Sequence, residues 1–218
     1  MKLNEKTIAV LKNFSLINQS IKITPGNTLA TMHPQRVLFA KAEVEDKFEN
    51  TFCIYELPQL LATLSMFENP DIEFRETDLV ISSGKQKVVY RYCDESAIIA
   101  APNKDLVLPD PEVNFELPEG VLASVIKATG VLQLPDIAIV GENGKLTIRA
   151  VKDADPGSNT FDVELGETEL TFKALFKPEY LSRLPNGSYK VEISSKKISR
   201  WIGENVYWVA LEKDSAFQ

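Results

Sequence analysis

The chain has 218 residues, of which 44% are hydrophobic and 25% are charged, and its formal net charge is −7. This composition is typical of a globular protein with room for two cores of about 100 residues each. No run of about 18 apolar residues occurs, so we expect no membrane-spanning helix, and the charged N-terminus is unlike a signal peptide. The net negative charge argues against a protein that coats nucleic acid through its overall charge.

The first predicted element is an amphipathic helix over residues 5–17. At 100° per residue, its large apolar side chains fall mainly on one half of the helix surface and its polar side chains on the other. Asn4 can accept a hydrogen bond from a free backbone N–H of the first turn, so it is the predicted N-cap. The apolar half consists of Ile8, Val10, Leu11, Phe14 and Ile17.

Strand-like segments and a second helix follow. Pro25-Gly26-Asn27, His33-Pro34 and the charged run 45–47 are the predicted turns between the first strands. The helix covers residues 56–67, and Pro58 is tolerated in its first turn. The predicted strands cover residues 20–23, 28–32, 36–44 and 48–55 before this helix, and 71–74, 79–83 and 87–92 after it.

Residues 102–118 contain four prolines. Proline fixes φ and removes an N–H donor, so this segment is predicted to be an extended connector rather than a helix or a central strand. It divides the chain into a first domain over residues 1–101 and a second domain over residues 119–218.

The second domain is predicted to begin with a helix over residues 119–132. Asn143-Gly144 indicates a tight hairpin, and residues 177–184 form a short helix. The inward side chains of the first of these helices are Leu122, Val125, Ile126, Thr129 and Leu132. The predicted strands cover residues 136–140, 146–151, 160–165, 169–176, 189–193, 198–202 and 205–212.

The chain repeats part of itself after about half its length. The segment that begins at Phe52, FCIYELPQLLATL, is echoed 120 positions later by FKALFKPEYLSRL, which begins at Phe172. A fixed-period echo of this kind indicates a duplicated unit. Neither half alternates strictly between strand and helix, so we expect an α+β fold with two similar domains, each with antiparallel sheets covered on one face by two helices.

Residue patterns typical of enzymes and of metal sites are missing. The single histidine, His33, lies in a predicted turn, and no nucleophile elbow, phosphate-binding loop or zinc spacing occurs. Residues 153–164 resemble a calcium loop but carry glycine at a ligand position, so we interpret them as an acidic turn. Cys53 and Cys93 are compatible with a disulfide, although two thiols are the expected state in a reducing cytoplasm. We therefore expect a binding or scaffolding protein without cofactor or metal.

The opening MKLNEKTIAVLKNFSLIN resembles the start of the sliding clamps of T-even-like phages. Looser similarity follows at Pro102-Asn103-Lys104, where the family's interdomain connector starts, and at Leu132-Gln133 and Ile137-Ala138-Ile139. The matching residues of the opening are Lys2, Leu3, Thr7, Ile8, Ala9, Leu11, Lys12, Asn13, Phe14, Ile17 and Asn18.

This resemblance implies a DNA polymerase processivity factor that is not an enzyme. Such a clamp is a homotrimer whose six similar domains form a ring around duplex DNA in the cytoplasm of the infected host. The implied partners are DNA, held without sequence preference, the C-terminal tail of the polymerase, and an ATP-driven clamp loader, with no membrane. Encirclement would also explain how an acidic protein works on DNA, because sliding needs only weak contacts with the phosphate backbone.

The family resemblance places the lining of the ring on the polar faces of the helices. Two departures make this lining thinly charged: Gly130 stands where the family tends to place a basic residue, and the helix over 56–67 offers only Gln59, Thr63 and Ser65. The predicted DNA-facing residues are Lys2, Lys6, Lys12, Lys127, Lys177 and Arg183.

The resemblance also implies a pocket for partner tails beside the connector and subunits joined through edge strands. The apolar connector residues could form that pocket, could pin the connector to the sheets, or could do both. The predicted pocket residues are Leu106, Val107, Leu108, Val113 and Phe115. The predicted interface residues are Val88, Val89, Tyr90 and Tyr92 on one strand, and Phe161, Val163 and Leu165 on the other.

Two alternatives to the clamp stay open at this point. A β-rich structural protein of the phage particle would also suit a duplicated domain with an acidic surface, and it would be found in purified particles without stimulating a polymerase. A hydrolase that uses scattered carboxylates would need a deep pocket with clustered acids whose pKa values are perturbed.

Overall fold

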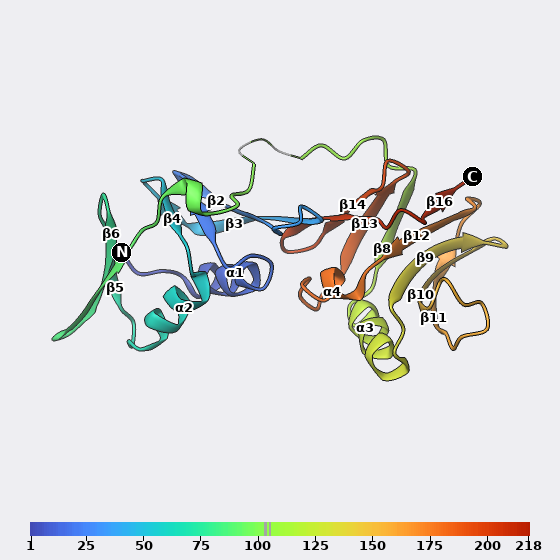
Figure 1. Ribbon diagram of the computed structural model, residues 1–218, viewed down its shortest axis with the longest axis horizontal. Coiled ribbons are helices and arrows are strands. Elements are labelled where there is room, and N and C mark those ends of the chain that lie inside the picture. Colours follow the sequence, from blue (N-terminus) through green and yellow to red (C-terminus); the bar gives the residue numbers. More distant parts are fainter. Residues whose placement is uncertain (103, 105) are drawn as a thin grey trace. The chain divides into compact units, whose positions relative to one another are not determined.

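The computed structural model of the protein describes residues 1–102, 104 and 106–218. Two residues of the predicted connector, Asn103 and Asp105, lie outside the described residues. The chain forms two compact units, unit 1 (Met1–Asp105) and unit 2 (Leu106–Gln218), coloured blue to green and green to red in Figure 1. The predicted antiparallel sheets are confirmed, because the strands within each unit pair antiparallel.

Unit 1 begins with the predicted helix, whose N-cap is confirmed because the Asn4 side chain accepts a hydrogen bond from the Lys6 N–H at 2.8 Å. The bounds of its elements are α1 (Glu5–Ser15), β1 (Ile21–Ile23), β2 (Gly26–Met32), β3 (Leu38–Phe48), β4 (Phe52–Ile54), α2 (Leu57–Ser65), β5 (Asp71–Phe74), β6 (Asp78–Ser83), β7 (Gln86–Arg91) and the 3₁₀ turn η1 (Glu95–Ala97).

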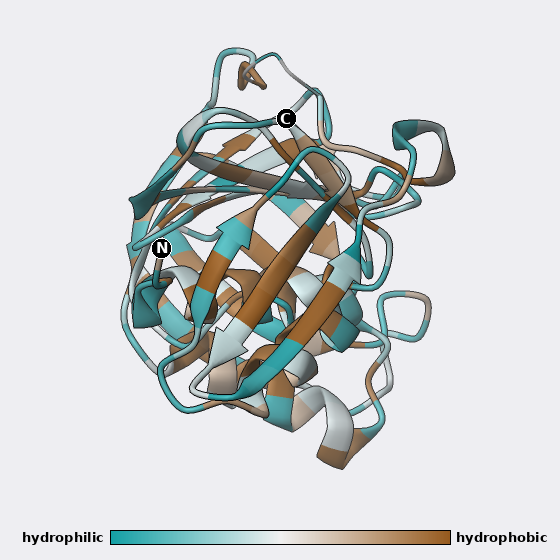
Figure 2. Ribbon diagram, turned by 90° about the vertical axis from the view of Figure 1, so that its left-hand side faces the viewer, coloured by the Kyte–Doolittle hydropathy of each residue, from teal (hydrophilic) through white to brown (hydrophobic). Residues whose placement is uncertain are grey.

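The strands of unit 1 form short sheets. β1 pairs with β4, β2 pairs with β3, and β6 lies between β5 and β7. The predicted turn at residues 45–47 is wrong, because β3 continues through it to Phe48. Charged residues do not interrupt a strand that has one solvated face, and Asp46 accepts a hydrogen bond from the Asn4 N–H at 2.7 Å. Figure 2 shows strand ribbons that change between brown and teal along their length, as expected for strands with one solvated face.

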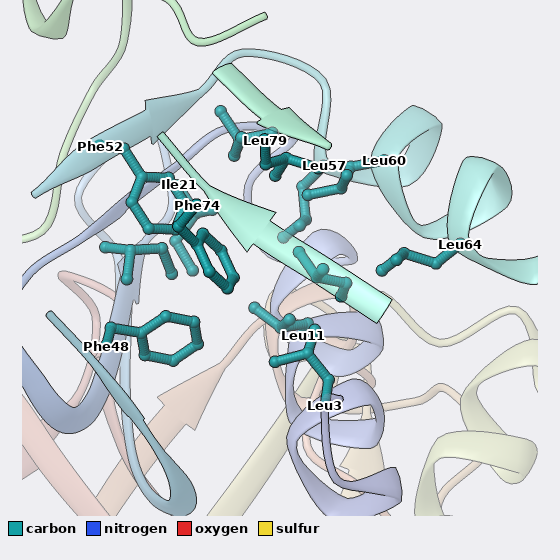
Figure 3. Close-up of a pocket in the computed structure, with 13 residues that line it drawn as sticks. Leu3, Leu11, Ile21, Phe48, Phe52, Leu57, Leu60, Leu64, Phe74 and Leu79 are labelled. Carbon is teal, nitrogen blue, oxygen red and sulfur yellow. The ribbon is translucent and has the colours of Figure 1, made fainter. Parts of the chain in front are cut away.

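The core of unit 1 lies between its two helices and its sheets. Leu11 of α1 and Leu57, Leu60 and Leu64 of α2 point toward Phe52 and its neighbours around a small cavity (Figure 3). The cavity has a volume of about 20 Å³ and a wholly apolar lining. A void of this size has room for about one water molecule, so it marks a place where the core is not completely filled.

Unit 2 has the same kinds of element in the same order, with an extra strand at each end. The bounds are β8 (Val113–Leu117), α3 (Val121–Leu132), β9 (Asp136–Glu142), β10 (Lys145–Val151), β11 (Phe161–Glu167), β12 (Phe172–Phe176), α4 (Pro178–Leu181), β13 (Tyr189–Ser194), β14 (Ile198–Ile202), β15 (Val206–Ala210) and β16 (Ala216–Phe217).

Two sheets form unit 2. One has the order β11-β10-β9-β12-β16, and the predicted hairpin between β9 and β10 is confirmed, with φ of 52° at Asn143 and 79° at Gly144. In the other sheet β8 pairs with β13, which pairs with β14, which pairs with β15. The last part of the predicted connector is thus the edge strand β8, and the short helix is only Pro178–Leu181 rather than 177–184.

Large aromatic side chains fill the core of unit 2. Trp201 is fully buried and meets Phe176 and Tyr189 edge to face, with ring centroids 5.9 and 6.1 Å apart. Its indole N–H donates to the Ser199 hydroxyl at 2.9 Å. The face of α3 that packs against the sheet buries Leu122, Val125, Ala128 and Thr129, whereas the predicted inward residues Ile126 and Leu132 are half-buried.

Candidate DNA-binding and assembly surfaces

Both long helices at the start of the two units carry lysines on their solvent side. Lys6 and Lys12 of α1 are exposed while the opposite side packs into the core, and Lys2 is exposed just before the helix. Lys6 lies 3.8 Å from Glu45, but its side chain remains 71% exposed, so solvent weakens this attraction. On α3 the exposed cation is Lys127. These four lysines are free to meet an anionic surface.

The remaining two cations predicted to face DNA lie around α4. Arg183 follows the helix and is half-buried. The Lys177 ammonium lies 2.7 Å from the Asp136 carboxylate, and this hydrogen bond raises the pKa of Lys177. Phe176 points into the core, so the next residue, Lys177, leaves the strand on the opposite face. Lys177 is therefore engaged within unit 2, which the sequence did not indicate.

Helix α2 contributes no charge to its exposed side. Gln59, Ala62 and Ser65 are exposed and Thr63 is half-buried, while Leu57, Leu60, Leu61 and Leu64 are buried. The Thr63 hydroxyl donates to the Gln59 carbonyl at 2.8 Å. A nucleic acid beside α2 would meet hydroxyl and amide groups, so any attraction must come from the other helices.

Two strands end their sheets with one edge unpaired within their own unit. β7 closes the sheet β5-β6-β7, and β11 closes the five-stranded sheet of unit 2. On β7, Val88 and Tyr90 lie opposite the core residues Ile81 and Leu79, so they share the core-facing side. On β11, Val163 lies opposite the fully buried Ile148 and Phe161 lies opposite the fully buried Ala150, while Leu165 is half-buried where the register with β10 shifts. Of the other predicted interface residues, Val89 is exposed on the opposite face and Tyr92 follows the strand.

The outer faces of these same two strands carry opposite charges. Lys87 and Arg91 are exposed on β7, and Asp162 and Glu164 extend from β11. Arg91 reaches Asp78 at 2.9 Å, and Glu164 reaches Lys145 at 2.8 Å, but the side chains of Arg91 and Glu164 stay 74% and 57% exposed. Only the apolar members of these strands were predicted from the sequence, although the alternation of charged and apolar residues also indicates the charged ones.

The predicted partner pocket is only partly available at the surface. Val113 is buried, and Phe115 lies on the same side of β8, so both serve to pin this strand to β13. Their packing fits the expected pinning of the connector, and their part in a partner pocket stays a prediction. Leu108 is also buried and Leu106 is half-buried, whereas Val107 is 82% exposed.

Comparison with known proteins decides the family. A family model described as DNA polymerase processivity factor matches residues 2–100, and one described as gp45 sliding clamp, C terminal, matches residues 114–213. The sliding clamp of Vibrio phage KVP40 is 33% identical over 97% of this chain and 99% of its own length. The chain belongs to the sliding-clamp family. The clamp of Enterobacteria phage T4 is 28% identical over 99% of this chain and 98% of its own length.

The fold agrees with this assignment. This clamp superimposes on A. fulgidus PCNA, in a structure with the bound C-terminal region of FEN-1, with a TM-score of 0.69 over 99% of this chain and 98% of that chain. Sequence identity in that comparison is only 14%, so the likeness concerns the fold. The clamp is thus a DNA polymerase processivity factor with two similar domains. The family match decides against the structural phage protein that the sequence had left open.

The acidic loop at residues 153–164 is used for ion pairs in this clamp. Asp153 binds Lys173 at 2.7 Å, and Asp155 binds Lys152 at 3.3 Å. Within the described part of the chain, no three His, Cys, Asp or Glu side chains are grouped so that they could hold a metal ion. None of the helices in that part is long and apolar enough to cross a membrane.

Proposed function

We propose that three copies of this clamp close into a ring around duplex DNA and hold the polymerase on its template. The observation that carries the proposal is the match between the two open sheet edges. β7 and β11 each present apolar side chains on the core side and charged side chains on the outer side, and the charges have opposite sign. A strand edge with unpaired N–H and C=O groups readily adds another strand.

In the proposed ring, β7 of one copy pairs with β11 of the next. Val88 and Tyr90 then lie beside Phe161, Val163 and Leu165 and extend both cores across the joint. Lys87 and Arg91 meet Asp162 and Glu164 on the outer face. Because the two edges differ, the contact runs head to tail, and head-to-tail contacts close into rings when the rotation between copies allows it.

The helices supply the proposed DNA channel. Lys2, Lys6 and Lys12 in unit 1, with Lys127 and Arg183 in unit 2, would provide its weak positive charge, and Lys177 would contribute least because Asp136 holds it. Contacts of this kind attract phosphates without reading bases, so the clamp can slide. Retention would depend on closure of the ring, which an ATP-driven loader would open in the host cytoplasm.

We also propose that the segment Leu106 to Leu108 receives the C-terminal tail of the polymerase. Val107 is the most exposed large apolar side chain among the described residues, which suits an anchor point for an apolar partner. A Val107→Asp clamp should stimulate polymerase much less while keeping its oligomeric state. Leu170→Asp, at another exposed apolar residue, is the matched control and should keep full stimulation.

The ring itself is tested by mass and by topology. Mass in solution, measured over a dilution series, should show a particle of three chains that dissociates at low concentration. Clamps loaded onto circular nicked DNA should stay bound and should be released when the circle is cut. A monomer at micromolar concentration, or retention that is indifferent to cutting, would contradict the proposal.

A further inference from the structure

Two cysteines in unit 1 lie on neighbouring backbone segments. The Cys93 N–H donates to the Cys53 carbonyl at 3.0 Å, and both cysteines are free thiols. Cys53 belongs to β4, and Cys93 lies two residues beyond the end of β7. A single N–H···O=C bond links the two residues through one N–Cα bond and one C–Cα bond, so their Cα atoms lie within about 6.5 Å of each other. Disulfides need Cα separations of about 4.4–6.8 Å, so the backbone is suitably spaced.

The surroundings of the two thiols also bring them together. Phe52 and Ile54 line the apolar cavity, so Cys53 between them points to the opposite face of β4. Tyr92 stacks on Phe52, with ring centroids 4.7 Å apart and an interplanar angle of 20°, so the residues directly before the two cysteines are also in contact. Burial raises the pKa of the Cys53 thiol, and the nearby Cys93 raises it further.

We propose that Cys53 and Cys93 form a thiol pair that closes to an intrachain disulfide when a small disulfide such as oxidised glutathione is present. Cys93 is half-buried and Cys53 is only 4% exposed, so the Cys93 thiolate attacks first. It forms a mixed disulfide and releases one glutathione thiolate. The Cys53 thiolate then attacks the sulfur of Cys93 and releases the second, so two protein thiols are oxidised and one glutathione disulfide is reduced to two thiols.

The bond would join two separate sheets of unit 1. Cys53 lies in the sheet of β1 and β4, and Cys93 follows β7 of the sheet of β5, β6 and β7 by two residues. These two sheets would then be fixed to each other at the end of β7. Because β7 is the proposed subunit edge, oxidation would also stiffen the strand through which the ring opens. Only this second consequence rests on the proposed function.

The experiment uses the full chain with oxidised glutathione at mildly alkaline pH. The expected result is a mass loss of about 2 Da and one linked peptide pair containing residues 53 and 93. We also expect a rise in Tm on the order of 10 °C that a reductant reverses. The controls are two single variants, Cys93→Ser and Cys53→Ala, which should each lose the cross-link. Cys93→Ser leaves the buried Cys53 in place. A persistent glutathione adduct, a covalent dimer or an unchanged mass would each overturn the thiol pair.

A second measurement separates the pair from its effect on assembly. The rate at which subunits exchange between rings should fall several-fold in the oxidised clamp and recover on reduction. If the cross-link forms while exchange stays the same, the proposed stiffening of β7 is wrong. If no trimer is found at all, the ring proposal fails, although the mass result still decides whether the thiols pair.

Discussion

Unit 2 completes sheets that unit 1 leaves in pieces, although both repeat one element order. β1 has three residues and pairs only with β4 in its sheet, whereas its counterpart β9 has seven and lies between β10 and β12. The turns explain the difference. Pro25 cannot donate to a ladder and interrupts the connection of β1 to β2, while Asn143-Gly144 allows β9 and β10 to pair over their whole length.

The same contrast appears between β5 and its counterpart β13, and between the cores of the two units. β5 gains only the hydrogen bonds of Ile72 with Met1 along its outer edge, whereas β13 pairs with β8 over five residues. Aromatic rings pack in both cores, but a cavity remains beside Phe52 and Phe74 in unit 1, whereas Trp201 meets two further rings edge to face in unit 2. The comparison teaches that a duplicated unit can keep its order of elements while only one copy joins its strands into extended sheets. We therefore expect unit 2 to be the more stable copy.

The largest effect is expected from a matched pair of leucines. Leu61 and Leu181 are counterparts in α2 and α4, but Leu61 is 9% exposed and Leu181 is fully buried. Substitution by alanine should cost about 4 kcal/mol at Leu181 and about 2 kcal/mol at Leu61, because a tightly packed site is less able to collapse around the space left behind. Denaturation followed by tryptophan fluorescence reports unit 2, which holds Trp201 and Trp208, and hydrogen exchange reports unit 1. Equal costs at the two sites would contradict the difference in packing.

Charge reversal at the edges should have the next largest effect. The double variant Lys87→Glu and Arg91→Glu places negative charge on β7 and should weaken the trimer about 10-fold by repulsion from Asp162 and Glu164. Mass over a dilution series measures this shift. Asp162→Lys with Glu164→Lys in the same chain should restore assembly, and failure of this rescue would count against the β7–β11 contact.

The acid sensitivity of unit 2 should depend on Glu192. Burial alone would raise the pKa of this carboxyl, but hydrogen bonds from Lys190 and Arg200 outweigh burial and hold its pKa below the ordinary 4.5. The ionised Glu192 therefore contributes its full stabilisation of the fold above pH 4.5, its ordinary pKa. This stabilisation is lost as the pH falls through the lower pKa that Glu192 has in the folded protein. Glu192→Gln should lower Tm at pH 7 and flatten the decline of Tm with acid. An unchanged pH profile would show that the pairs contribute nothing measurable.

The smallest effect is expected from the channel lysines. Lys127→Gln should reduce polymerase processivity by about twofold or less. It should also make the dependence of DNA affinity on salt shallower, by about 0.9 in the log–log slope for each phosphate that the clamp no longer neutralises. Lys213→Gln, exposed near the C-terminus, is the control. A collapse of processivity with Lys127→Gln would mean that charge rather than encirclement holds the DNA.

The sequence by itself determined what depends on neighbouring residues. The apolar stripe of α1 with its Asn4 cap and the hairpin at Asn143-Gly144 are local patterns, and the structure confirms the cap, the hairpin and the burial of Val10, Leu11 and Phe14, although the helix ends at Ser15. The echo of Phe52 at Phe172 can likewise be read from the sequence alone. The resemblance of the opening to phage clamps belongs to the same class of information. These signals sufficed for an antiparallel fold in two similar copies.

The tertiary structure alone decided which residues meet across long stretches of chain. The charged run 45–47 stays in β3, Val113 is buried against β13 despite nearby prolines, and Lys177 turns to Asp136. Cys93 comes to lie beside Cys53 in the same way. Strand pairing joins residues that are far apart in sequence, and burial on one face outweighs a local preference for turns, so no short window of residues contains these outcomes.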